Sequence, residues 1–302
     1  MTIADAARIL QSGGVVAFPT ETVYGLGANA LDEAAVRRVY ELKGRPSTSP
    51  LIVHVSSIEM ARNLSRAWPD AAERLARQYW PGPLTLVVPK SSAIPDIVTA
   101  GLDSVGLRMP RHPLALELIR TTGLPLAAPS ANKFTQISPT TAEHVRNAFG
   151  DEVPVLDGGP CDVGIESTVV AVSADGAVRL LRPGMLVLPE AVFATPESTD
   201  GTPHEAPGMH RKHYSPRHAR VLLVSPGETP PVDAAYVWHH VEQPDATIAV
   251  QMPADPEAYA ARIYAVLHDL DARGVHTIAV ESLPENAEWD ALRDRLRRSA
   301  AE

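Results

Sequence analysis

The chain has 302 residues, of which 45% are hydrophobic and 21% charged, and its formal net charge is −9. This length allows one large domain and a small one, with a composition that is ordinary for a globular protein. The acidic balance argues against general binding of nucleic acids, which depends on neutralising phosphates, but it leaves room for a local basic pocket. The single cysteine, Cys161, excludes internal disulfides and zinc clusters built from cysteines.

Targeting signals are not evident in the sequence. Residues 1–14 predict a short amphipathic helix ended by Gly13-Gly14, because no basic region precedes an apolar run. No stretch approaches the roughly 18 uninterrupted apolar residues that cross a bilayer. We therefore expect a cytoplasmic protein without membrane association.

Residues 1–194 mix apolar strands with amphipathic helices. A strand is predicted at 15–18, a helix at 33–42 capped by Asp32, a strand at 51–55, and helices near 57–67 and 69–79. Further strands are expected at 84–88, 104–109 and 124–128, with a helix at 113–120. The capping box Thr140-x-x-Glu143 predicts a helix ending near Gly150, and strands follow near 153–156, 167–173 and 177–182, the last two joined by a turn at Asp175-Gly176. Helical crossovers combined with hairpins indicate an α/β domain with a mixed twisted sheet.

The composition changes at residues 195–218, which are rich in proline and histidine and lack apolar periodicity, so this segment reads as a linker. Residues 219–302 then predict a small second α/β domain. Its expected elements are strands at 219–224, 234–241, 247–250 and 275–281 and helices at 255–273 and 284–299.

Several common catalytic motifs are missing from the sequence. It contains no G-x-x-x-x-G-K-[ST] phosphate loop, no G-x-S-x-G elbow and no H-E-x-x-H zinc motif. The run from Gly25 to Ala30 loosely resembles a dinucleotide-binding turn, but alone this is weak evidence, and two glycines that simply allow a tight turn are the preferred explanation.

Two pairs of polar residues suggest an anion site. Lys43 and Arg45 lie between a predicted helix and strand, where fixed cations can hold phosphates, although a helix C-terminus favours such charges in any case. Ser130 and Asn132 follow a predicted strand. Open α/β sheets bind ligands beyond the ends of their strands, but Ser and Asn also cap turns there.

Longer motifs in a fixed order resemble a known family. These are PTETVYGLGANA (19–30), KGRPSTSPLIVH (43–54), PSANKFTQISPTT (129–141), GIESTVV (164–170) and LRPG (181–184). Together they resemble the YrdC-like family of threonylcarbamoyl-AMP synthases. PGMHRKHYSP (207–216) is similar to the linker of the two-domain members, although His210, Arg211 and Ser49 differ from the residues common there. The resemblance implies a YrdC-like domain at 1–194, a linker at 195–218 and a smaller Rossmann-like α/β domain at 219–302.

The resemblance also implies a reaction and a set of site residues. L-threonine, bicarbonate or CO2, and ATP with Mg²⁺ would give L-threonylcarbamoyl-adenylate and pyrophosphate, and a tRNA-modifying complex would use the product. We expect little direct binding of tRNA and no metal ligands from protein side chains. The implied catalytic residues are Lys43, Arg45, Ser130 and Asn132; those for threonine are Thr22, His54, Arg108, Ala128, Ser167 and Thr168; those for ATP are Arg45, Ser49, Ser104, Ser130, Ser138, Arg182 and Tyr214. From the sequence alone, His54 would equally suit a core position in a buried strand.

Other classes of function remain in view. An RNA-binding module of the same fold would need a broad basic face, which the net charge of −9 opposes. A carbamoyltransferase of the hydrogenase-maturation type would carry cysteine-rich zinc fingers, and a regulatory protein would not need the four polar residues named above. We also predict that residues 206–216 form a lid hinged at Gly208, with Tyr214 shielding the product from water.

Overall fold

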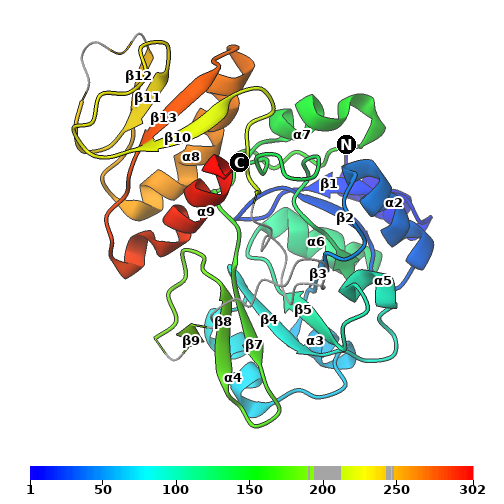
Figure 1. The fold of residues 1–302 in the computed structure, drawn as a ribbon. Coiled ribbons are helices and arrows are strands. Elements are labelled where there is room, and N and C mark those ends of the chain that lie inside the picture. Colours follow the sequence, from blue (N-terminus) through cyan, green and yellow to red (C-terminus); the bar gives the residue numbers. More distant parts are fainter. Residues whose placement is uncertain (190, 194–211, 243–245, 247, 302) are drawn as a thin grey trace.

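The computed structural model describes residues 1–189, 191–193, 212–242, 246 and 248–301. Within these residues the strands form two separate sheets, one of nine strands and one of four. Figure 1 shows the smaller sheet beside the larger part of the molecule, with two helices between them. No helix in the described part of the chain is long and apolar enough to cross a membrane.

The larger unit combines parallel and antiparallel pairs. Its elements are α1 (Ile3–Gln11), β1 (Val16–Phe18), β2 (Gly25–Asn29), α2 (Glu33–Lys43), β3 (Ile52–His54), α3 (Ile58–Asn63), α4 (Asp70–Tyr79), β4 (Leu84–Pro89), α5 (Asp96–Thr99), β5 (Ser104–Arg108), α6 (Pro113–Thr122), β6 (Leu126–Ala127), α7 (Ala142–Phe149), the 3-10 turn η1 (Gly150–Glu152), β7 (Thr168–Val172), β8 (Val178–Arg182) and β9 (Val192–Phe193). The strand order is β1-β2-β6-β3-β5-β4-β7-β8-β9. Among the described strands of this nine-stranded sheet, β3–β5, β4–β7 and β8–β9 pair in parallel and the other pairs are antiparallel.

Helices cover both faces of this sheet. Side chains alternate between the two faces along each strand. Phe18 of β1 accordingly packs with Leu10 of α1 and Leu118 of α6, whereas its neighbour Ala17 joins the core that contains Val36 of α2. The sheet edge that carries the strand ends is therefore left for ligands.

The smaller unit is a parallel sheet backed by two helices. It contains β10 (Arg220–Val224), β11 (Ala235–Trp238), β12 (Ile248–Gln251), α8 (Pro256–Ala272), β13 (Thr277–Glu281), the turn η2 (Ala287–Trp289) and α9 (Asp290–Ala300), with the strands in the order β10-β13-β11-β12. Helices α8 and α9 lie on the side that faces the larger unit (Figure 1). The predicted fold class, a mixed twisted α/β sheet with a small second α/β domain, is confirmed. The boundaries at 194 and 218 stay a prediction, because residues 194–211 lie outside those described.

Local signals placed most elements correctly. Asp32 caps α2 by accepting from the N–H groups of Ala34 and Ala35, and the turn at Asp175-Gly176 joins the antiparallel pair β7–β8. The helix predicted from Thr140 instead has Thr141 as its N-cap, whose hydroxyl accepts from the His144 N–H.

Three other predictions were wrong. Residues 153–156 form only one bridge, between Ala17 and Val155, and Pro154 has no N–H with which to extend a strand ladder. The last helix begins at Asp290 rather than 284, after the turn η2. Strand β2 was missed because its glycines suggest a turn. A Cβ on Gly27 would lie 2.6 Å from the Phe18 ring, so glycine lets the two strands pair closely.

Candidate active site

The strand ends bring three predicted site residues together. Strands β3 and β5 are parallel neighbours, and His54 at the end of β3 is the register partner of Arg108 at the end of β5. Ala128 directly follows β6, and its N–H donates to the carbonyl of Ile52 in β3 at 2.9 Å. The sheet topology therefore places these residues side by side.

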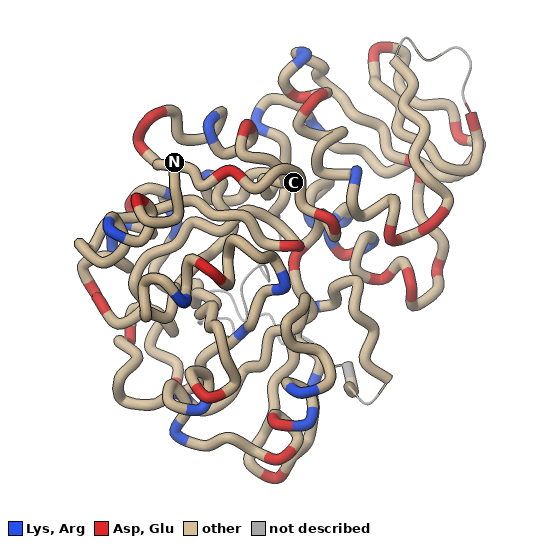
Figure 2. The backbone as a smooth tube through the Cα atoms, turned by 180° about the vertical axis from the view of Figure 1, so that it is seen from behind, with Lys and Arg blue, Asp and Glu red and all other residues tan. Residues whose placement is uncertain are grey.

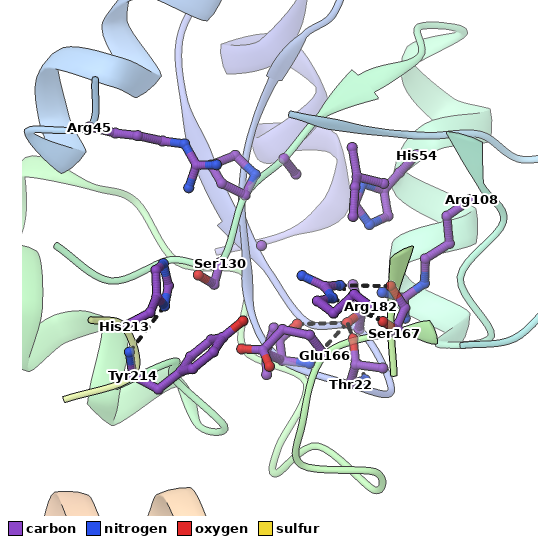
Figure 3. A pocket seen from close by; sticks show the side chains of 16 residues that line it. Thr22, Arg45, His54, Arg108, Ser130, Glu166, Ser167, Arg182, His213 and Tyr214 are labelled. Atoms are coloured by element: carbon purple, nitrogen blue, oxygen red, sulfur yellow. Dashed lines mark hydrogen bonds between the residues drawn. The ribbon is translucent and has the colours of Figure 1, made fainter. Parts of the chain in front are cut away.

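A pocket opens at this edge. Its lining residues are Thr20, Thr22, Val23, Gly25, Arg45, Ile52, His54, Arg108, Ala128, Pro129, Ser130, Glu166, Ser167, Arg182, His213 and Tyr214. Figure 3 shows His54 and Arg108 on one side and Arg45, Ser130, His213 and Tyr214 on the other, with Glu166, Ser167 and Arg182 between them. Some of the residues predicted for each of the two substrates thus share one pocket.

Arg108 presents unsatisfied donors to this pocket. The side chain is 4% exposed, and its Nη2 lies 2.8 Å from Oε1 of the buried Glu21. That contact is close but poorly aligned, so Nε and Nη2 of Arg108 have no hydrogen-bond partner among the described residues. Glu21 is itself fixed, since its Oε2 accepts from the Arg111 N–H at 3.0 Å. A buried guanidinium held in this way is suited to a carboxylate ligand.

His54 is a neutral polar group in the same half of the pocket. Burial and the neighbouring Arg108 lower the pKa of His54 to about 3. The ring meets Phe18 edge-on at 5.8 Å, and Nδ1 has no hydrogen-bond partner within the described structure. The side chain is buried as a core histidine would be, yet it also lines the pocket.

Ser167 and Arg182 form the centre of the pocket. Nη2 of Arg182 donates to the carbonyl of Ser167 at 3.0 Å and to its Oγ at 3.2 Å, and that Oγ lies 2.8 Å from Oγ1 of Thr85. Burial lowers the pKa of Arg182. The next residue, Thr168, is turned away from the pocket, with its hydroxyl donating to the carbonyl of Leu186 at 2.7 Å.

Arg45 and Tyr214 supply the other half. Nη2 of Arg45 donates to the carbonyl of Pro50 at 3.1 Å, and burial lowers the pKa of Arg45 to about 10. Tyr214 is 1% exposed, and its hydroxyl, which points into the pocket in Figure 3, has no hydrogen-bond partner in the described part of the chain. A cation and a free hydroxyl therefore face the same space beside Ser130.

Lys43 and Asn132 do not line the pocket. The Lys43 ammonium is buried and donates to the backbone carbonyls of Ser130, at 2.7 Å, and of Asn132. Burial lowers its pKa well below the usual range. The Asn132 amide donates to the carbonyls of Lys133 and Gln136. Through these backbone hydrogen bonds, Lys43 and Asn132 hold the loop that contains Ser130.

The remaining predicted residues lie around the pocket rather than in its lining. Ser49 is buried and its carbonyl accepts from Arg45, while Ser104 begins β5 and lines a separate small cavity. Ser138 donates to Oε1 of Glu166 at 2.5 Å. Sequence reasoning missed Glu166 as a lining residue, although it lies inside the GIESTVV motif, and treated His213 as a linker histidine.

Residues 195–211 of the predicted linker, including Gly208, His210 and Arg211, lie outside the described residues. The lid therefore stays a prediction. The part that is described, from Lys212 onward, contains His213 and Tyr214, both buried at the pocket.

The fold and the site define an α/β protein with a cationic, partly buried pocket for small anions. Residues 8–184 match the Sua5, YciO and YrdC family, described as "Telomere recombination", and residues 179–301 match "Threonylcarbamoyl-AMP synthase, C-terminal domain". The chain belongs to this family, as the motifs indicated.

The similarity extends over both units. Proteins named threonylcarbamoyl-AMP synthase from Pyrococcus abyssi and Bacillus subtilis are each 39% identical to this chain, over 99% of its length and 94% and 92% of theirs. The crystal structure of P. abyssi Sua5 complexed with L-threonine matches with a TM-score of 0.89 at 37% identity, covering 99% of this chain and 94% of that one.

Proposed function

We propose that this protein synthesises L-threonylcarbamoyl-adenylate from L-threonine, bicarbonate or CO2, and ATP, with release of pyrophosphate. The observation that carries the proposal is the single pocket with two cationic halves, one at Arg108 and one at Arg45. Two anionic substrates that must react with each other need such an arrangement, because their mutual repulsion has to be offset.

L-threonine would occupy the half that contains Arg108. Its carboxylate would accept from the unpaired donors of Arg108, and the neutral ring of His54 would add a hydrogen bond without adding charge. Thr22 and the central Ser167 also line the pocket and would offer hydroxyl groups to the substrate. The structure of the P. abyssi relative complexed with L-threonine supports L-threonine as a substrate.

ATP would occupy the half that contains Arg45, Ser130 and Tyr214, with Arg182 between the two substrates. Magnesium would accompany the nucleotide and offset part of its charge. The described residues contain no cluster of three or more side chains that could hold a metal, and Glu166 is already engaged by Ser138, Tyr264 and Arg295. We propose that the phosphates and water supply most of the ligands of the ion.

The reaction requires no nucleophile from the protein. The threonine amine attacks CO2, or bicarbonate with loss of hydroxide, and gives up a proton to form a carbamate. A carbamate oxygen then attacks the α-phosphorus of ATP, and the bond to the departing pyrophosphate breaks. Alignment of reactants alone can supply roughly 7–11 kcal/mol of such a barrier. The buried guanidinium groups would stabilise the charge that develops on the phosphate.

An RNA-binding module is the alternative. Acidic and basic positions are interspersed over both units in Figure 2, and the net charge is −9. Both features argue against a broad basic face for RNA and support an enzyme that works on small anions. We propose that it acts in the cytoplasm and leaves the tRNA to another complex.

The direct test is pyrophosphate release in buffer stripped of CO2. We expect release only when L-threonine, ATP and bicarbonate are all present, and labelled bicarbonate should appear in an adenylate. Release that is equal without bicarbonate would instead identify an ordinary amino-acid adenylating enzyme. RNA binding measured across a range of salt concentrations tests the alternative.

A further inference from the structure

Glu166 places a carboxylate in a pocket whose proposed substrates are anions. Uncompensated, its charge would repel them strongly in a buried site. Burial alone would raise the pKa of Glu166, but the charges of Arg295 and Arg182, together with the hydrogen bonds from Ser138 and Arg295, hold that pKa below the usual range. The carboxylate is therefore ionised, and its charge has to be offset by neighbours.

Two of the groups that bind Glu166 come from the second unit. Nε of Arg295, on α9, donates to Oε2 at 2.8 Å, and the hydroxyl of Tyr264, on α8, donates to the same oxygen at 3.2 Å. Ser138 of the first unit donates to Oε1. The negative charge of Glu166, in the first unit, is thus offset by Arg295 of the second unit.

Arg295 connects three parts of the pocket wall. It is 1% exposed, and its Nη2 donates to the carbonyl of Pro183 at 3.0 Å, directly after Arg182. The guanidinium carbon also lies 5.2 Å from the centre of the Tyr214 ring. One side chain therefore contacts the loop before β7, the loop after β8 and the aromatic residue that faces the nucleotide half.

The backbone around Tyr214 is held from both sides. The Ser215 N–H donates to the carbonyl of Thr135 at 2.9 Å in the first unit, and the His213 N–H donates to the carbonyl of Arg298 at 3.2 Å at the end of α9. Tyr214 itself has a φ of 62°, a left-handed conformation that costs free energy for a residue with a side chain. These contacts stabilise that conformation.

The second unit is packed directly on the pocket wall. A Cβ at Gly164 would lie 2.2 Å from the carbonyl oxygen of Ala260 in α8, so only glycine fits there. Val23, which lines the pocket, and Ile165, which precedes Glu166 in the chain, belong to the same hydrophobic core as Tyr264. Movement of α8 or α9 would therefore move the site.

We propose that Arg295 of the second unit is a positioning residue for the nucleotide half of the active site. It offsets the charge of Glu166 and fixes the ring of Tyr214 so that the hydroxyl points into the pocket (Figure 3). This inference rests on the proposed function, which assigns that half to ATP. It makes the second domain part of the active site rather than an independent module.

The first test compares Arg295→Met with Arg295→Lys. Loss of charge-assisted hydrogen bonds of this kind weakens binding by about ten- to a hundredfold. We expect Arg295→Met to raise the KM for ATP by that factor and the KM for L-threonine by about threefold or less, and Arg295→Lys to restore part of the loss. The matched control is Arg293→Met on the same helix, which removes a guanidinium bound to Asp290 and the carbonyl of Pro284, away from the pocket.

A second test separates charge compensation from packing. In the Arg295→Met background, Glu166→Gln should recover ATP affinity, because the unpaired carboxylate is gone. If Arg295→Met does not fold, Tyr264→Phe removes a single hydroxyl from the network and should still raise the KM for ATP. Its control is Tyr259→Phe, a buried tyrosine on the same helix whose hydroxyl has no hydrogen-bond partner in the described structure.

Calorimetric titration with ATP alone and with L-threonine alone keeps this test independent of turnover. Weaker ATP binding with unchanged threonine binding supports the positioning role. Equal losses for both substrates in Arg295→Met and Tyr264→Phe, or no recovery with Glu166→Gln, would overturn it. A wild-type protein that binds ATP but releases no bicarbonate-dependent pyrophosphate would overturn the proposed function instead.

Discussion

Lys43→Met tests whether the buried ammonium of Lys43 stabilises the folded protein or serves only to bind phosphate. The ammonium donates to the carbonyls of Ser130 and Asn132, which the methionine would leave buried without that donor. Two charge-assisted hydrogen bonds of about 1.5–3 kcal/mol each set a ceiling of about 3–6 kcal/mol. Removing a buried charge also removes its desolvation cost, which offsets part of this loss. We therefore expect Lys43→Met to lower the unfolding free energy of the protein, measured without ligands, by at least about 2 kcal/mol.

Denaturant unfolding of the ligand-free protein measures this loss through the linear dependence on denaturant. Lys133→Met is the control, because its ammonium donates to the carbonyl of Leu42 at 2.9 Å but its side chain is 39% exposed. A change within about 1 kcal/mol is expected there. If Lys43→Met leaves stability unchanged or raises it while ATP use collapses, Lys43 is a phosphate ligand alone and the reasoning fails.

Three further predictions concern the threonine half. His54 has a pKa of about 3 in the folded protein, whereas in the unfolded chain it is protonated near pH 6.5, so the free energy of unfolding falls as the pH drops from about 6.5 towards 3. Between pH 7 and pH 5, His54→Asn should therefore lose about 2 kcal/mol less unfolding free energy than the wild type. Equal losses in the two proteins would contradict this. Gly184→Ala should raise the KM for threonine, because the new Cβ would lie 2.3 Å from the Thr168 nitrogen and would displace the backbone next to Ser167, which lines the pocket. An unchanged KM would show that the loop adapts. Arg108→Lys, which loses the planar fork, should raise the KM for threonine about tenfold or more with a smaller effect on ATP, and the reverse pattern would reassign Arg108.

Predictions from short sequence patterns were correct for structural features that depend on interactions between neighbouring residues. The Asp32 cap, the turn at Asp175-Gly176 and most helices follow from neighbouring residues. The placement of His54 beside Arg108 follows from the parallel strands β3 and β5, whose ends meet at one edge of the sheet. Short-range signals together with the family resemblance therefore located the pocket.

The unpredicted features depend on contacts between distant parts of the chain. The acceptor carbonyls of Lys43 lie 87 and 89 residues away, and Arg295 lies 129 residues from Glu166. A charged residue at a helix end looks the same in sequence whether it faces solvent, phosphate or a buried carbonyl. Glycines that permit the close pairing of β1 and β2 likewise look like turn glycines.

The charges of the pocket explain how an acidic chain can bind anions. Arg45, Arg108 and Arg182 are all buried, and burial of a cation costs free energy that protein carboxylates only partly offset. Glu21 engages Arg108 through a poorly aligned contact, and Glu166 is shared with Arg295. The ligand-free pocket therefore keeps cationic donors that anionic substrates complete, so that substrate binding and stability are coupled. On this argument the net charge of the chain does not determine whether the site can bind anions, because the buried arginines and the few carboxylates that neutralise them set the local charge of the pocket.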